Sequence, residues 1–176
     1  MTLKKIPKLI LVILAIVILA GCSDEKNNTT TANTNNNQTE ISGSETEGME
    51  KLTCSREADA GEGVDVNLDY EIYYQGEYIQ ILHSTEQIVT EDQATLDEYE
   101  NAYKKIYKNY EGLKYYDNNI DRTDNSVTND TVINYGKIDT DKLLEIEGEE
   151  DNVIKDGKVK LSDWLDFAEQ FGTKCE

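Results

Sequence analysis

Residues 64–75 alternate between apolar and polar side chains, which predicts a strand with one buried face. Its apolar positions are Val64, Val66, Leu68, Tyr70, Ile72 and Tyr74. A two-residue loop at Gln75 and Gly76 would place these positions opposite the apolar residues that follow. In this register Tyr73 lies opposite Tyr78 on the face that the alternation assigns to solvent. The pattern therefore predicts an amphipathic hairpin.

A helical spacing of apolar residues follows the hairpin. Thr90 and Gln93 form a candidate capping box before it, and Gly112 ends it. The repeating positions are Leu96, Tyr99, Tyr103, Ile106, Tyr107 and Tyr110. A ligand-binding stripe of tyrosines is one interpretation. The favoured interpretation is a helix that packs its aromatic face on a sheet.

The remaining pattern completes a single domain. Residues 113–116 and 131–135 predict two further strands around an Asp/Asn-rich connection, and a short helix is expected near 141–147. A last helix begins at Ser162 and ends before Gly172. We therefore predict an α+β fold: an antiparallel sheet of about four to five strands, with a long helix and a C-terminal helix packed on one face.

The N-terminal region has the pattern of a signal peptide. Three lysines precede residues 9–20, a run without any polar side chain that is too short for a comfortable transmembrane helix. The run ends in Leu19-Ala20-Gly21-Cys22, which resembles the lipobox of bacterial lipoproteins. We predict a signal peptide over residues 1–21 and a lipid on Cys22. The alternative is an ordinary thiol after a short anchor helix.

Residues 22–48 are rich in Asn, Thr, Ser and Glu and are predicted to form a disordered tether. A self-associating Asn-rich tract is the alternative interpretation. The globular domain would then span residues 49–176, a length sufficient for one core. Together these segments predict a protein anchored by lipid to the outer face of the bacterial cytoplasmic membrane.

Composition narrows the possible partners. The 176-residue chain has 17 Lys and Arg against 36 Asp and Glu, which excludes the clustered cations of a nucleic-acid-binding protein. An acidic domain instead favours a basic or cationic envelope protein or peptide, in addition to the membrane reached through the anchor. No nucleic acid is expected.

Cys54 and Cys175 lie at the two ends of the predicted domain. Thiols oxidise outside the cytoplasm, and Cys22 would be consumed by lipid, so these two are predicted to form a structural disulfide. A redox pair is the alternative, but the chain has no CxxC spacing.

Few residues suit catalysis or metal binding. His83 is the only histidine and is interpreted as an ordinary strand residue. A calcium-loop-like stretch at 152–163 has Ile154 at a ligand position, and the Asp/Asn-rich connection resembles a solvated turn. The candidate oxygen ligands in that connection are Asp121, Asp124, Asn125, Asn129 and Asp130. We expect no catalytic residues, no metal site and no cofactor, and leave open whether this loop binds a cation.

An ordered set of short motifs resembles the YehR-like family of small bacterial lipoproteins, particularly its Gram-positive members with two cysteines. The matching segments are the lipobox, residues 70–76, residues 133–135, Ile138-Asp139 with Leu143, and Phe171-Gly172 before Cys175. The resemblance implies an α+β domain in the cell envelope. It implies no site residues, since no activity is agreed for that family.

Two function classes remain. A non-catalytic binding or structural module is favoured, and a small envelope hydrolase that uses Asp/Glu pairs is the alternative. A carboxyl group with a strongly raised pKa in a cleft would favour the enzyme. For the module, Tyr73 and Tyr78 form the candidate partner patch, because tyrosines recur at interface hot spots. Cross-strand stabilisation, or cover by another helix, is the alternative role for this pair.

Overall fold

A computed structural model describes residues 41–61, 63–149 and 152–176. The predicted signal peptide, Cys22 and most of the predicted tether lie outside the described residues. Residues 41–48 form turns that precede the first strand. Within the described part of the chain, no helix is both long and apolar enough to cross a membrane.

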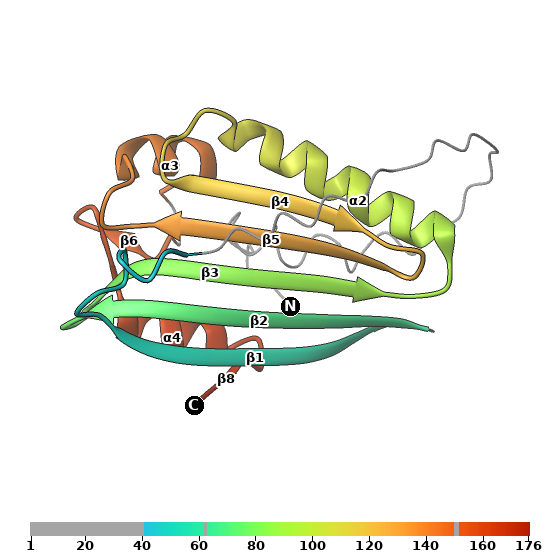
Figure 1. Ribbon diagram of the computed structural model, residues 1–176, viewed down its shortest axis with the longest axis horizontal. Helices are drawn as coiled ribbons and strands as arrows, with labels where there is room; N and C mark the ends of the chain where they lie inside the picture. Colours follow the sequence, from blue (N-terminus) through green and yellow to red (C-terminus); the bar gives the residue numbers. More distant parts are fainter. Residues whose placement is uncertain (1–40, 62, 150–151) are drawn as a thin grey trace, which may run out of the picture.

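An antiparallel sheet in the order β4-β5-β3-β2-β1-β8 forms the body of the domain (Figure 1). A short hairpin of β6 and β7 joins the sheet where β7 pairs with β3. The strands are β1 (Glu50–Gly61), β2 (Val64–Gln75), β3 (Tyr78–Val89), β4 (Tyr116–Arg122), β5 (Ser126–Asn134), β6 (Ile154–Lys155), β7 (Lys158–Lys160) and β8 (Lys174–Cys175). The α+β antiparallel fold is confirmed, and the sheet has more strands than expected because β1 and the short strands β6, β7 and β8 were not predicted.

Three α-helices pack on one side of the sheet, here called the inner face, which is turned away from the viewer in Figure 1. They are α2 (Gln93–Tyr107), α3 (Thr140–Glu147) and α4 (Leu161–Glu169), and a 3-10 turn, η2 (Lys108–Tyr110), extends α2. Leu96 and Tyr103 of α2 are fully buried, and Trp164 of α4 lies against Tyr70 of β2. The predicted long helix and C-terminal helix are both present.

The β2–β3 hairpin has a different register from the predicted one. Gln75 pairs with Tyr78 across a loop of Gly76 and Glu77. Gly76 has a φ of 60°, and it stands at the first central position, where a type II′ turn requires glycine. A bulge at Gln80 then shifts the pairing, so that Ile72 lies opposite Leu82. Alternation alone does not predict this bulge. Because of it, Ile79 and Leu82 both face the core.

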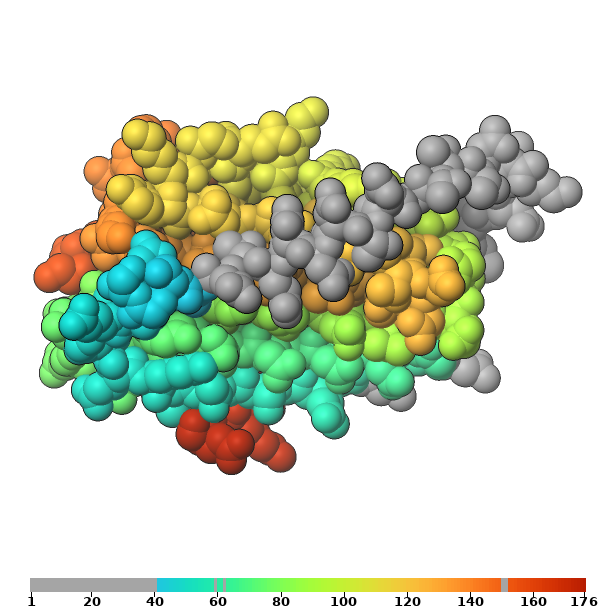
Figure 2. Space-filling view, in the orientation of Figure 1, coloured from blue at the N-terminus to red at the C-terminus, as the bar shows by residue number. Residues whose placement is uncertain are grey.

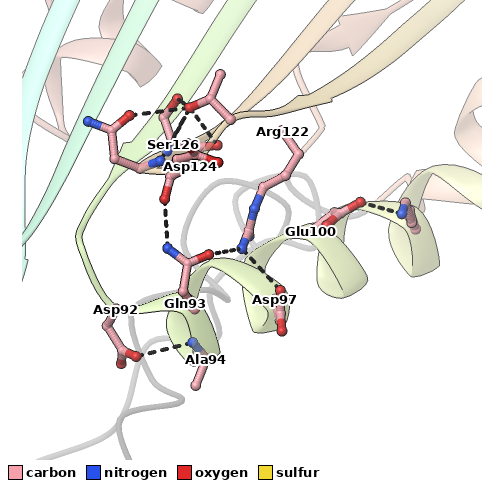
Figure 3. Close-up of polar contacts among 11 residues, drawn as sticks. Asp92, Gln93, Ala94, Asp97, Glu100, Arg122, Asp124 and Ser126 are labelled. Atoms are coloured by element: carbon pink, nitrogen blue, oxygen red, sulfur yellow. Dashed lines mark hydrogen bonds and ion pairs between the residues drawn. The ribbon is translucent and has the colours of Figure 1, made fainter. Parts of the chain in front are cut away.

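The N-terminus of α2 also differs from the prediction. Asp92, rather than Thr90, caps the helix by accepting a hydrogen bond from the Ala94 amide at 3.1 Å. Gln93 does not close a capping box. Its side chain donates to the Asp124 carbonyl at 2.6 Å and accepts from Arg122 at 2.9 Å (Figure 3). The start of α2 is thereby tied to the β4–β5 turn.

The Asp/Asn-rich connection is not a loop but a hairpin. β4 and most of β5 fall within it, and the turn contains only Thr123, Asp124 and Asn125. The polar residues were misleading because every second one faces solvent, while Tyr116, Ile120 and Val127 face the core. The predicted strand over residues 113–116 is wrong at all but its last residue.

The predicted disulfide between Cys54 and Cys175 is confirmed. The sulfur atoms lie 2.04 Å apart, and the two residues pair directly between β1 and β8. Cys54 is buried on the inner face, so the bond closes the edge of the core. It joins residues 121 positions apart in the chain.

Candidate functional site

A cavity of about 110 Å³ lies where α2, α3 and α4 meet the inner face of the sheet. Most of the lining is aromatic or aliphatic, including Tyr70, Tyr107, Tyr110, Tyr116, Tyr135 and Trp164. Concave, largely apolar sites with a few polar groups are typical of small-ligand binding. This cavity is the candidate functional site.

Two groups of aromatic rings form its walls. Tyr110 stacks on Tyr116 with the ring centroids 4.4 Å apart, and Tyr107 lies within 6.2 Å of both. In the other group Tyr70 meets Trp164 edge-to-face at 5.2 Å. Burial raises the pKa of Tyr107 to about 12, so this hydroxyl keeps its proton at neutral pH. The walls are therefore uncharged.

Glu147, the last residue of α3, is the only carboxylate among the described residues of the lining. Burial raises its pKa to about 7, and hydrogen bonds from Asn152 and Tyr110 oppose that rise. Asn152 Nδ2 donates at 3.0 Å and the Tyr110 hydroxyl at 3.5 Å. Among the described residues, no cation pairs with this carboxylate. The protonated and ionised forms of Glu147 are therefore both populated near neutral pH.

Arg56 is the only cation that the described part of the chain contributes to the lining. It stands on the inner face of β1, opposite Leu68, and that row of the sheet continues to Glu86 on β3. No hydrogen bond or ion pair to Arg56 is formed within the described part of the chain. Glu86 lies outside the lining and is buried, which raises its pKa to about 8. Arg56 thus forms no hydrogen bond within the described part of the chain, although its positive charge lowers the pKa of Glu86 and of Tyr70 against the effect of their burial.

The outer face of the sheet carries a polar network around His83. Its Nε2 lies 2.6 Å from Asp130 and its Nδ1 3.8 Å from Glu71. The hydrogen bond to Asp130 raises the pKa of His83 despite partial burial, and both carboxylates add to the rise by charge. Lys51 also pairs with Glu71 at 2.6 Å. Both ring nitrogens of His83 therefore face carboxylates.

Tyr73 and Tyr78 do not lie opposite each other. Tyr73 pairs with Ile81, and Tyr78 pairs with Gln75 at the turn. Tyr73 is partly buried and donates a hydrogen bond to Glu71 at 3.1 Å, whereas Tyr78 is 37% exposed. The ammonium groups of Lys51 and Lys158 lie over the two rings at 5.5 and 4.9 Å. Each tyrosine therefore has its own basic neighbour.

The Asp/Asn candidates for a cation site are spread over both faces. Asp121 and Asp130 stand on the outer face, and Asp124 and Asn125 are in the β4–β5 turn. Asn129 is on the inner face, where its side chain donates to the Tyr107 hydroxyl at 2.9 Å. Within the described residues, no group of three or more His, Cys, Asp and Glu is placed to hold a metal ion.

Sequence reasoning missed both charged residues of the cavity. A signal for Glu147 was present, because it lies four residues after the buried Leu143 and shares its helical face. Arg56 continues the alternation of Leu52, Cys54 and Ala58 on the inner face of β1. Each is a charged residue at a position where the periodicity expects an apolar one.

Comparison with solved structures shows a likeness in fold at low sequence identity. The NMR structure of the YehR protein from Escherichia coli aligns with a TM-score of 0.52 and 15% identity, over 73% of this chain and 92% of YehR. An NMR structure of a protein from Streptococcus pneumoniae TIGR4 aligns with a TM-score of 0.49 and 14% identity, over 89% and 99% of the two chains. No family model and no curated protein matches the sequence. The domain is similar in fold to YehR.

Proposed function

We propose that this protein is a lipid-anchored lipoprotein of the bacterial cell envelope whose folded domain is a non-catalytic binding module. The lipobox-like sequence ending at Cys22 supports the anchor. The ordered short motifs and the likeness in fold to YehR support membership of the two-cysteine, Gram-positive group of YehR-like lipoproteins. Its place would be the outer face of the cytoplasmic membrane.

The observation that carries the location is the disulfide between Cys54 and Cys175. Such bonds persist in oxidising compartments and are rare in the cytosol of mesophiles. A chain that begins with a signal-peptide pattern and then closes its domain with a disulfide has two independent features of an exported protein.

The cavity supports binding rather than catalysis. Hydrolysis by acid pairs needs two carboxyl groups on either side of the bond that breaks, at a separation of about 5 to 9 Å. Among the described residues of the lining, Glu147 is the only carboxylate and Arg56 is the only cation. Aromatic walls with two charged groups are suited to holding a small molecule.

A carboxylate-based enzyme is the second candidate, and Glu147 is the observation that favours it. A pKa of about 7 in a cavity suits a general acid or base. The enzyme would need a second reacting group delivered by the substrate or by water. Release of product from a panel of envelope esters and glycosides by the wild type, lost in Glu147→Gln, would favour this second function over the first.

The outer face of the sheet is our candidate surface for a basic or cationic envelope protein or peptide. The three helices lie on the other face, and the segment of residues 41–48 reaches one end of this one (Figure 2). Its exposed acids include Glu57, Asp65, Asp69 and Asp117. Charge complementarity would steer a cationic partner to this face.

Tyr73 and Tyr78 are the proposed contacts of that partner. Crosslinking in intact cells followed by mass spectrometry would identify it. The double variant Tyr73→Ser and Tyr78→Ser should then capture it about tenfold less efficiently, because tyrosines anchor interfaces. Unchanged capture, or a domain that unfolds readily, would assign the two tyrosines a structural role.

Metabolic labelling with palmitate tests the anchor. The wild type should take up label and sediment with membranes, and Cys22→Ala should do neither. Cys54→Ala is the matched control, since it removes another cysteine and leaves the lipobox intact. Wild-type protein without label would refute the proposed function.

A further inference from the structure

The two charged groups of the cavity stand on different elements. Arg56 is on β1, and Glu147 contacts Tyr110, which stacks on Tyr116 of β4. Three strands of the sheet separate β1 from β4, yet both charged side chains line this one cavity. One side of the cavity therefore offers a guanidinium and the other a carboxyl group. A ligand that uses both must itself carry both signs of charge.

The surroundings of Glu147 indicate the kind of positive group. Its oxygens already accept hydrogen bonds from Asn152 and Tyr110, and the neighbouring walls are tyrosine rings. A primary ammonium has three donors that each need an acceptor, and Glu147 already accepts two hydrogen bonds. A quaternary ammonium has no donor and is attracted to the faces of aromatic rings. The site therefore suits an alkylated cation.

Arg56 indicates the negative group. Its guanidinium presents several donors in a planar fork that matches a carboxylate or phosphate, and none is engaged within the described residues. The size of the cavity, about 110 Å³, limits the ligand to a small molecule. An apolar cavity of about 150 Å³ in another protein holds one benzene.

We propose that the cavity binds a small organic zwitterion, with its quaternary ammonium against the tyrosine walls and Glu147 and its anionic group on Arg56. This inference rests on the proposed binding function and names the class of ligand. The acidity of the chain, with a net charge of −19, favours the approach of the cationic end.

Trp164 provides a direct test, because it is the only tryptophan in the chain and it lines the cavity. Glycine betaine is the probe, titrated into the purified full chain while tryptophan fluorescence and binding heat are recorded. A saturable change in both is expected. Tetramethylammonium, which lacks the anionic group, should bind about tenfold more weakly.

Two cavity variants and a matched pair on the outer face sharpen the test. Arg56→Gln should weaken glycine betaine about tenfold and leave tetramethylammonium unchanged, whereas Glu147→Gln should weaken both probes. Lys51→Gln and Glu71→Gln remove the same two charge types from the outer face and should change neither. Arg56→Lys keeps the positive charge and serves as a second variant if Arg56→Gln melts early.

The outcomes separate the two proposals. The zwitterion site is overturned if glycine betaine gives no saturable signal, or if both cavity variants bind it like the wild type. Cys22-dependent labelling with palmitate would still stand in that case, and the proposed envelope function with it. Absence of lipid on Cys22 together with normal betaine binding would instead overturn the location and leave the site.

Discussion

The two faces of the sheet shift the pKa of a glutamate in opposite directions. Glu86 points to the inner face, where burial raises its pKa to about 8. Glu71 stands on the outer face of the neighbouring strand, where a hydrogen bond from Lys51 holds its pKa below the ordinary value. The protonation state of each acid therefore depends on its burial and on its hydrogen-bond partners. A count of acidic residues in the sequence therefore overstates the charge near the core.

This contrast extends to the aromatic residues. Inner tyrosines such as Tyr103 fill space between the sheet and α2, and their burial is nearly complete. Outer tyrosines pair singly with lysines. The inner face should therefore govern stability, and the outer face should govern contact with other molecules.

The largest change in the free energy of unfolding is expected from removing the disulfide at the edge of the sheet. Replacing both Cys54 and Cys175 by Ala should lower the free energy of unfolding by about 4 to 5 kcal/mol, because the bond closes a long loop in the unfolded chain. Urea unfolding of the oxidised wild type and the double variant measures the loss. A difference below about 1 kcal/mol would mean that the bond constrains little.

Adjacent residues of β2 compare the two faces directly. Ile72 is 0% exposed, and Ile72→Ala should cost about 2 to 5 kcal/mol through lost burial and a cavity. Tyr73→Ala on the outer face should cost about 1 kcal/mol or less. The same urea series checks both. Equal losses would contradict the assignment of the inner face as the core.

Glu86 should make the stability depend on pH. Its ordinary pKa is 4.5, and its folded pKa is about 8. Between these values the unfolded chain has lost the proton and the folded chain has kept it, so the free energy of unfolding falls as the pH rises. Glu86→Gln should reduce that fall by up to about 1 kcal/mol per pH unit.

Unfolding midpoints of the wild type and Glu86→Gln between about pH 5 and about pH 8 test this slope. Asp139→Asn is the control, since the hydrogen bond from Lys142 lowers the pKa of this exposed acid and its loss should leave the slope in this range unchanged. Parallel curves for the wild type and Glu86→Gln would show that Glu86 is ionised in the fold.

The smallest effect is expected at His83. Its folded pKa is raised, so its ion pairs stabilise the fold fully below the ordinary pKa of 6.5 and lose that effect as the pH rises through the folded value. His83→Gln should cost about 1 kcal/mol or less near pH 6 and less again near pH 9. An NMR titration of the single imidazole gives the pKa directly, and a value below 6.5 would be inconsistent with this network.

The sequence pattern predicted the elements that place only apolar residues on one face. β2 alternates cleanly and α2 repeats its tyrosines, so both were located from the sequence. β4 was missed because a strand with asparagines on both faces reads as a turn, although Asn118 is held by Asn129 and Thr131. The register of the β2–β3 hairpin depended on the turn at Gly76 and Glu77 and on the bulge at Gln80, and alternation encodes neither.

The cavity could not be predicted, since it depends on packing between distant elements. Arg56 and Glu147 come from β1 and α3 and share no sequence motif. In each element, the sequence does show a charged residue at a position where the repeat of apolar residues predicts an apolar one. Only the fold shows that these two positions border the same space.

The bond between Cys54 and Cys175 also has a mechanical consequence. A pull on the N-terminal end of β1 and on Glu176 is carried by the covalent bond, because β8 is fixed to β1 close to both ends of the domain. The strands and helices between the two cysteines lie outside the path of the load. The domain can therefore bear tension between its two ends while its cavity keeps its shape.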